Sequence, residues 1–213
     1  MNKPSPTHDK SSAPESPSEL PLIEFVAQGS FSIHNPESSR NIQSWEAADF
    51  TLGQHTELIQ ADDMQAVRRH SLALMQQAQD SLCIYSTDLE PWLYNHNCIL
   101  EACRTLLLKH PKKNLRILLL DSSRIVREGH VLLALSRRLS SRCSIRKVNV
   151  EHDYSPDAWL IADNCGALVR KAQHLHQAVV YYQHPARVRE IQHAFNAMWD
   201  VSLSDVNLRS MTL

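Results

Sequence analysis

Apolar residues recur at spacings of three and four in four segments of the chain, which is the pattern of a helix that buries one face. Between these segments lie short, nearly continuous apolar runs, which are typical of buried strands. The predicted helices span about 63–79, 95–109 and 125–139, and a last helix begins at His184-Pro185. The predicted strands span 81–85, 115–120, 144–150, 157–163, 167–170 and 178–182.

The order of these elements predicts the fold. Strands that alternate with helices pair in parallel, with right-handed crossovers and with helices on the faces of the sheet. The consecutive strands after residue 144 add an antiparallel portion, in which Asp157–Asp163 is the first arm of a hairpin that turns at Asn164-Cys165-Gly166. We therefore predict an α/β domain with a mixed, mostly parallel sheet flanked by helices.

Composition divides the chain into three parts. Residues 1–21 are rich in Ser and Pro and bury too little apolar surface to fold, so we predict a disordered tail. Residues 22–49 are interpreted as an N-terminal arm or edge segment, and residues 50–213 as the α/β domain. The sequence has no signal-peptide pattern and no apolar run long enough to cross a bilayer, so we expect a cytoplasmic protein.

Charge is unevenly distributed along the chain, although the net charge is -1. From Arg104 to Lys147 there are twelve Arg and Lys against only Asp121 and Glu128, which favours an anionic partner for this segment. The alternative is that solvated helix faces happen to use arginine. Five cysteines without a CxxC pair are typical of buried, reduced thiols rather than of disulfides or zinc ligands.

Polar side chains gather where the predicted strands end, which is where open α/β sheets usually bind ligands. These ends carry Asp88, Glu90 and Tyr94 after one strand, Asp121, Arg124 and Arg127 after the next, and Asp163 after the hairpin strand. A carboxylate cluster of this kind could bind a metal or transfer protons. The alternative is that the Asp residues cap helices and turns, as Asp often does.

Other motifs for chemistry are absent from the sequence. Twelve histidines include no HExxH pair, and four glycines cannot build a phosphate-binding loop, so we predict no metal and no cofactor. A phosphate-binding face could be formed by Arg124, Arg127, Arg137, Arg138, Arg142 and Arg146. No aromatic residue lies between positions 104 and 150, which weakens the case for stacking on nucleic-acid bases.

Three local patterns resemble one half of the phospholipase D superfamily. Asp62-Asp63-Met64, leading to Ala78–Tyr85, is similar to the opening helix and first strand of that half. Asp157–Asp163 has the length and apolar core of the strand with the motif HxKxxxxD, and Ile191–Trp199 resembles the closing helix. The resemblance covers about residues 50–203 and implies a half-domain that pairs with another, within one chain or as a homodimer.

The chain departs from the superfamily at its catalytic motif. In active members the His attacks phosphorus and the Lys binds the phosphate oxygens. Here the resemblance places Asp157 and Trp159 at these positions, and Asp163 at the closing Asp. The other HxK segments, at His8 and His110, do not complete the motif. Losing the nucleophile and the cation together should abolish this chemistry.

Residues 86–94 also resemble a degenerate form of this domain in uncharacterised bacterial proteins, some of which carry a GNAT-type acyltransferase. The chain lacks the Q/RxxGxG/A loop that binds acetyl-CoA, so acyl transfer is not expected.

We therefore hypothesise a non-catalytic phospholipase D-like domain with a binding or regulatory role. Its predicted ligand surface comprises Asp88, Glu90, Tyr94, Arg124, Arg127 and Asp163. The ligand would be anionic and phosphate-bearing, a nucleic acid being one such ligand, or a protein partner. The alternative is a phosphodiesterase or phosphotransferase with a rebuilt site around Asp157 and Asp88, using His152 or His130. A third hypothesis is a pure interaction module for an acyltransferase or another chain.

Overall fold

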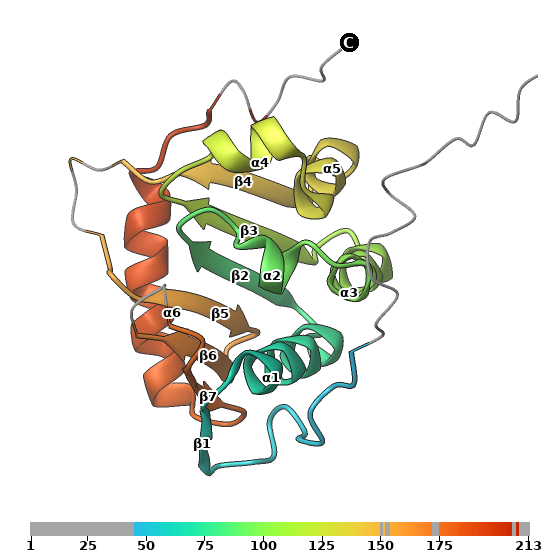
Figure 1. Ribbon diagram of the computed structural model, residues 1–213, viewed down its shortest axis with the longest axis vertical. Coiled ribbons are helices and arrows are strands. Elements are labelled where there is room, and N and C mark those ends of the chain that lie inside the picture. Colours follow the sequence, from blue (N-terminus) through green and yellow to red (C-terminus); the bar gives the residue numbers. More distant parts are fainter. Residues whose placement is uncertain (1–44, 150, 152–153, 172–174, 206–207, 209–213) are drawn as a thin grey trace, which may run out of the picture. The chain divides into compact units, whose positions relative to one another are not determined.

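The computed structural model describes residues 45–149, 151, 154–171, 175–205 and 208. The predicted tail, residues 1–21, and residues 22–44 of the predicted arm lie outside this part of the chain. A sheet of seven strands forms the centre, in the order β1-β7-β6-β5-β2-β3-β4 (Figure 1). The strands are β1 (Leu58–Ala61), β2 (Ser81–Ser86), β3 (Asn114–Leu119), β4 (Cys143–Lys147), β5 (Ala158–Ala162), β6 (Gly166–Arg170) and β7 (Ala178–Tyr181).

The pairing within the sheet is mixed. β2, β3 and β4 run parallel to one another, because helices α3 (Asn97–Lys109) and α5 (Val131–Arg138) carry the chain back between them. The other neighbouring strands, from β2 through β5 to β1, are antiparallel. The predicted α/β class is confirmed, with a smaller parallel share than expected. The reason is that no helix separates β4 from β5, or β5 from β6, within the described residues.

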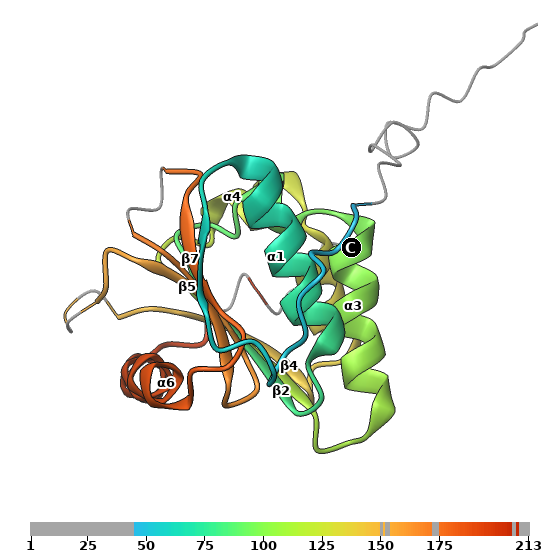
Figure 2. The same ribbon diagram turned by 90° about the horizontal axis from the view of Figure 1, so that it is seen from below.

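Helices cover both faces of the sheet. α1 (Met64–Gln77), α3 and α5 pack on one face, and α6 (Pro185–Asp200) packs on the other, as Figure 2 shows. Asp63 caps α1, because its Oδ1 accepts a hydrogen bond from Ala66 N at 2.8 Å. None of the helices in the described part of the chain is long and apolar enough to cross a membrane.

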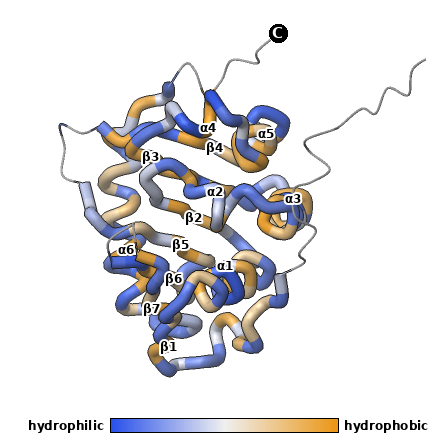
Figure 3. The backbone as a smooth tube through the Cα atoms, viewed as in Figure 1, coloured by the Kyte–Doolittle hydropathy of each residue, from blue (hydrophilic) through white to orange (hydrophobic). Residues whose placement is uncertain are grey.

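The sheet separates two apolar cores. The core under α1, α3 and α5 includes Ile84 and Leu160, and the core under α6 includes Tyr85 and Trp159. Side chains alternate in this way because successive residues of a strand point to opposite faces. Figure 3 shows apolar positions along the strands and a mixture of apolar and polar positions along the helices.

The helix predicted over 125–139 is two helices. α4 (Ser123–Glu128) ends at Gly129, whose φ of 75° is a conformation that L side chains rarely adopt. α5 begins after His130, whose Nδ1 accepts a hydrogen bond from Leu132 N at 3.1 Å. This break places Arg124 and Arg127 on the short α4, which follows the end of β3.

Candidate functional site

The carboxyl ends of β2 and β3 meet at one edge of the sheet, and ion pairs join them. Arg124 Nη1 donates to Asp88 Oδ2 at 2.9 Å, and Arg124 Nε donates to Glu128 Oε2 at 3.1 Å. Arg127 Nη2 donates to Glu128 Oε1 at 3.1 Å. The hydrogen bonds from Arg127 and Arg124 hold the pKa of Glu128 below its usual value. Carboxylates therefore already bind both arginines that we expected to contact an anionic ligand.

Glu90 belongs to a buried network at the same edge. Ser86 Oγ donates to Glu90 Oε2 at 2.6 Å, and Arg170 Nη2 forms an ion pair with Glu90 Oε1. Only 1% of Arg170 is exposed, so its charge is removed from water, and the carboxylate of Glu90 helps to neutralise it. Tyr94, which ends α2 (Pro91–Tyr94), is also buried, and burial raises the pKa of its hydroxyl.

Local contacts fix the turn between β2 and α2. Leu89 adopts a φ of 58°, and its N–H donates to Ser86 Oγ at 3.1 Å. Glu90 N donates to Asp88 Oδ1 at 3.1 Å. Because the backbone turns at Leu89, Glu90 is directed toward Arg170 while Asp88 is directed toward Arg124.

Asp163 lies at the opposite edge of the sheet. β5 is antiparallel to β2, and Ala162 pairs with Leu82 near the start of β2. The carboxylate of Asp163 accepts hydrogen bonds from Gln79 N at 2.9 Å, Asp80 N at 2.7 Å and Ser81 N at 2.9 Å. Its φ of 53° allows the tight turn into β6. The structure therefore brings together five of the predicted residues, Asp88, Glu90, Tyr94, Arg124 and Arg127. Asp163 is not among them, because its carboxylate binds the turn before β2.

The strand that resembles the HxKxxxxD motif is β5, and its aromatic residue is part of the core. Trp159 is 7% exposed and packs against Tyr85, with 5.1 Å between the ring centroids. Burial raises the pKa of Tyr85 to about 12, and its hydroxyl donates to Ser155 O at 2.7 Å. Trp159 thus has a packing role that accounts for its place in the strand.

The alignment of the motif itself needs a correction. Counted back from Asp163 with the spacing of HxKxxxxD, the His and Lys positions fall on Pro156 and Ala158, whereas the sequence prediction placed Asp157 and Trp159 there. Neither alignment supplies a His or a Lys.

The histidine proposed for a rebuilt catalytic site serves the backbone instead. His130 is 6% exposed, and its Nε2 lies 3.2 Å from Leu89 O, which requires the proton on Nε2. Its Nδ1 accepts from Leu132 N at 3.1 Å. Both ring nitrogens are thus engaged in holding loops, Asp88 is in an ion pair, and His152 lies outside the described residues.

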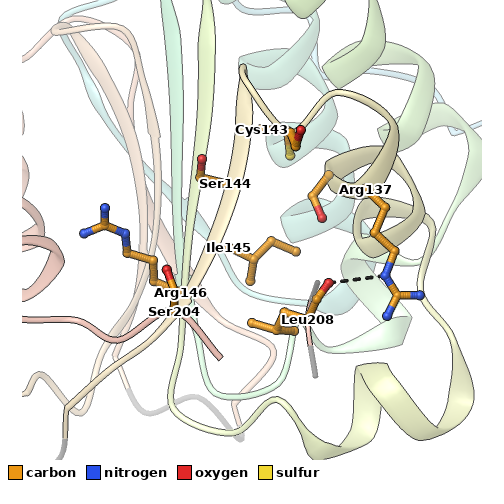
Figure 4. Close-up of a pocket in the computed structure, with 9 residues that line it drawn as sticks. Arg137, Cys143, Ser144, Ile145, Arg146, Ser204 and Leu208 are labelled. Atoms are coloured by element: carbon orange, nitrogen blue, oxygen red, sulfur yellow. Dashed lines mark hydrogen bonds between the residues drawn. The ribbon is translucent and has the colours of Figure 1, made fainter. Parts of the chain in front are cut away.

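A pocket of about 500 Å³ lies beside β4, which is an edge strand of the sheet (Figure 4). Its lining includes Ser136, Arg137, Ser144, Arg146 and Leu208. Arg137 Nε donates to Leu208 O at 3.2 Å, and Figure 4 shows Arg137 and Arg146 pointing away from each other. The two guanidinium groups therefore do not converge on one ligand inside this pocket.

Arg170 is the site residue that sequence reasoning missed. It pairs with Glu90, 80 residues earlier, and its guanidinium carbon lies 5.4 Å from the centroid of Trp92. The available signal was a charged residue at the end of the apolar run Ala167–Arg170. A buried strand that ends in Arg predicts a buried carboxylate, but it does not say which one.

One model of a known protein family matches the sequence of this chain. A family model described as "Domain of unknown function (DUF7931)" matches residues 63–211, which is more than half of the chain. The chain belongs to the DUF7931 family. A comparison of this DUF7931 domain with curated protein sequences finds no match.

Three solved structures are similar to the DUF7931 domain. TrmBL2, an archaeal chromatin protein, is 12% identical with a TM-score of 0.53, over 71% of this chain and 54% of that one. Nuc from Salmonella typhimurium, a phospholipase D family member, is 14% identical with a TM-score of 0.48, over 69% of this chain and 95% of that one. NucT from Helicobacter pylori is 8% identical with a TM-score of 0.47, over 70% and 98%. Nuc carries the family name that the sequence resemblance predicts, and at these identities each likeness concerns the fold alone.

Proposed function

We propose that this DUF7931 domain binds a phosphate-bearing ligand and does not cleave it. The observation that carries the proposal lies in β5, where neither alignment with HxKxxxxD supplies the nucleophilic His or the cationic Lys. Covalent catalysis at phosphorus needs a nucleophile, and the developing charge needs a cation to stabilise it. Without these two groups the domain keeps a scaffold for binding and lacks the residues for attack.

The electrostatics of the strand ends support the same proposal. Arg170 stands directly opposite Ala158 in the register of β5 and β6, so it is the cation beside the motif's Lys position. Glu90 already binds it. A phosphate that took Arg170 from Glu90 would leave a buried carboxylate without its partner, which is strongly unfavourable.

The charge distribution supports an anionic ligand. The segment from Arg104 to Lys147, with its twelve cations, runs from the second half of α3 through β3, α4 and α5 to β4, so most of the positive charge belongs to the end of the sheet at β3 and β4. Arg124 and Arg127 are one proposed contact surface in this segment. A phosphate there would compete with Glu128, which binds both guanidinium groups.

Turnover assays with the full chain test the proposal. We expect no release of p-nitrophenol from bis(p-nitrophenyl) phosphate above the buffer rate, with Mg²⁺ or with a chelator. We also expect pyrophosphate or a single-stranded oligonucleotide to raise the unfolding temperature, because a ligand that binds the folded state stabilises it. Turnover that disappears in Asp157→Asn would instead establish the rebuilt catalytic site.

A further inference from the structure

The sheet face that carries α6 has charged side chains where α6 does not cover it. α6 lies across one end of the strands, and β3 and β4 continue beyond it (Figure 1). On this face β3 presents Arg116, and β4 presents Ser144 and Arg146. The register shows this, because Arg116 pairs with Cys83 and with Ser144, Arg146 pairs with Leu118, and Cys83 and Leu118 belong to the core under α6.

Both guanidinium groups on this face lie against the same aromatic ring of α6. The guanidinium carbon of Arg146 is 4.5 Å from the centroid of Trp199, and that of Arg116 is 5.5 Å from the same centroid and 5.2 Å from that of Phe195. Arg146 Nη1 also donates to Trp199 O at 2.9 Å. Two positive charges thus both lie against Trp199, in cation–π contacts that limit their motion.

Neither charge is balanced by a carboxylate in the described part of the chain. Arg104, Arg124, Arg127, Arg170 and Arg187 all form ion pairs there, whereas Arg116 and Arg146 form none. Arg116 Nη2 instead contacts Cys83 Sγ at 3.4 Å, and burial raises the pKa of that thiol, so the sulfur is neutral. Arg146 receives partial compensation from the carbonyl end of α6, which is less than a full charge.

Neutral hydrogen-bonding groups surround the two arginines. Ser144 pairs with Arg116 across β3 and β4 and lies two residues before Arg146, and its hydroxyl makes no hydrogen bond to the residues that the structure describes. Gln192 Nε2 contacts Cys83 Sγ at 3.7 Å and donates to Asn196 Oδ1 at 3.1 Å, so the amide nitrogen of Asn196 remains as a donor. Half-buried cations and neutral donors together are the composition of an anion site.

We propose that Arg116 and Arg146, with Ser144 and Asn196 beside them, bind the phosphate group of the ligand. This set is the arginine face. The inference rests on the proposed function, and it places the phosphate beside α6 rather than at the strand-end pair of Arg124 and Asp88. Guanidinium groups bind phosphate oxygens through charge-assisted, directional hydrogen bonds, and the ion neutralises both charges. The phosphate belongs either to a small molecule or to a nucleic-acid backbone.

Binding measurements on the full chain test the arginine face. The probes are sodium pyrophosphate and a fluorescein-labelled single-stranded DNA, measured by calorimetry and by fluorescence anisotropy. Arg116→Gln/Arg146→Gln should raise the Kd about tenfold or more, because two charge-assisted hydrogen-bonding groups are lost. The matched control Arg187→Gln/Arg189→Gln removes the same charge from the surface of α6, outside the segment of twelve cations, and should leave the Kd within about twofold.

A second variant keeps the test valid if the double Gln variant does not fold. Ser144→Asp adds a carboxylate between the two arginines and should abolish binding by occupying them. Ser141→Asp adds the same charge at an exposed position before β4, outside the lining of the pocket that Ser144 and Arg146 share, and should have little effect. Unfolding temperatures of all variants report whether each is folded.

The outcomes separate this inference from the proposed function. If the arginine-face variants lose the binding of both probes, the site accepts any phosphate group. If the wild-type chain binds DNA but not pyrophosphate, and the variants lose DNA binding, the phosphate comes from a nucleic-acid backbone. Wild-type affinity in the arginine-face variants overturns the inference, and if Arg124→Gln/Arg127→Gln then loses binding, the proposed function stands with the strand-end site. A wild-type chain that binds neither probe overturns both the inference and the phosphate-bearing ligand.

Discussion

Replacing Glu90 by Gln should destabilise the domain severely, because it removes a carboxylate that neutralises the buried charge of Arg170. Arg170 is 1% exposed and Glu90 is 8% exposed, so water cannot take over the role of the carboxylate. Breaking a buried ion pair from one side typically lowers the free energy of unfolding by about 3–5 kcal/mol. For a domain of this size that corresponds to a fall in unfolding temperature of about 6–20 °C.

Urea unfolding followed by far-ultraviolet circular dichroism measures this change. The control is Glu101→Gln, which breaks a surface pair at 3.4 Å whose side chains are 52% and 61% exposed, and which should change stability by less than about 1 kcal/mol. Glu90→Leu/Arg170→Met, which removes both charges, should recover much of the loss. If Glu90→Gln is no worse than Glu101→Gln, the reasoning about a desolvated, mutually dependent pair is refuted.

Three further predictions concern other parts of the domain. Asp163→Ala should lower the free energy of unfolding in urea by about 2 kcal/mol through its lost backbone hydrogen bonds; unchanged stability with lost ligand binding would contradict the structural role. Burial, and then the charge of Arg69, lower the pKa of His70, so the unfolded chain binds more protons below about pH 6.5. Stability should therefore fall as the pH drops below that value, by at most about 1.4 kcal/mol per pH unit for this residue, and His70→Gln should reduce the slope. Burial raises the pKa of Cys103 to about 12, so Ellman's reagent should modify it at pH 8 only after unfolding, and rapid labelling of the native protein would contradict this.

Local sequence patterns were sufficient for most elements of the fold but not for strand direction. The apolar run at β5 and the turn after it predicted the hairpin, and the structure confirms both. Whether β5 lies parallel or antiparallel to β2 depends on contacts between segments that are far apart in the sequence. Cys83 of β2, for example, lies opposite Ile161 of β5. A periodic pattern contains no information about such a partner. Gly129, in contrast, was a visible local signal for the break between α4 and α5.

The same limit explains which site residues were found. Asp88 and Arg124 follow parallel neighbouring strands, so the rule about carboxyl ends placed them together correctly. Asp163 follows a strand of opposite direction, so the same rule placed it at the wrong edge. The aromatic neighbours of Arg116 could not be predicted either, because Trp199 belongs to a helix 83 positions later that reaches this face through the fold.

Binding without cleavage is the central claim, and one incubation tests it most directly. A labelled single-stranded DNA is kept with excess protein and Mg²⁺ for many hours, and the sample is divided between a native gel and a denaturing gel. The account predicts a retarded complex on the first gel and strands of unchanged length on the second. Shorter strands that appear with the wild-type chain, and disappear with Asp157→Asn, would contradict it.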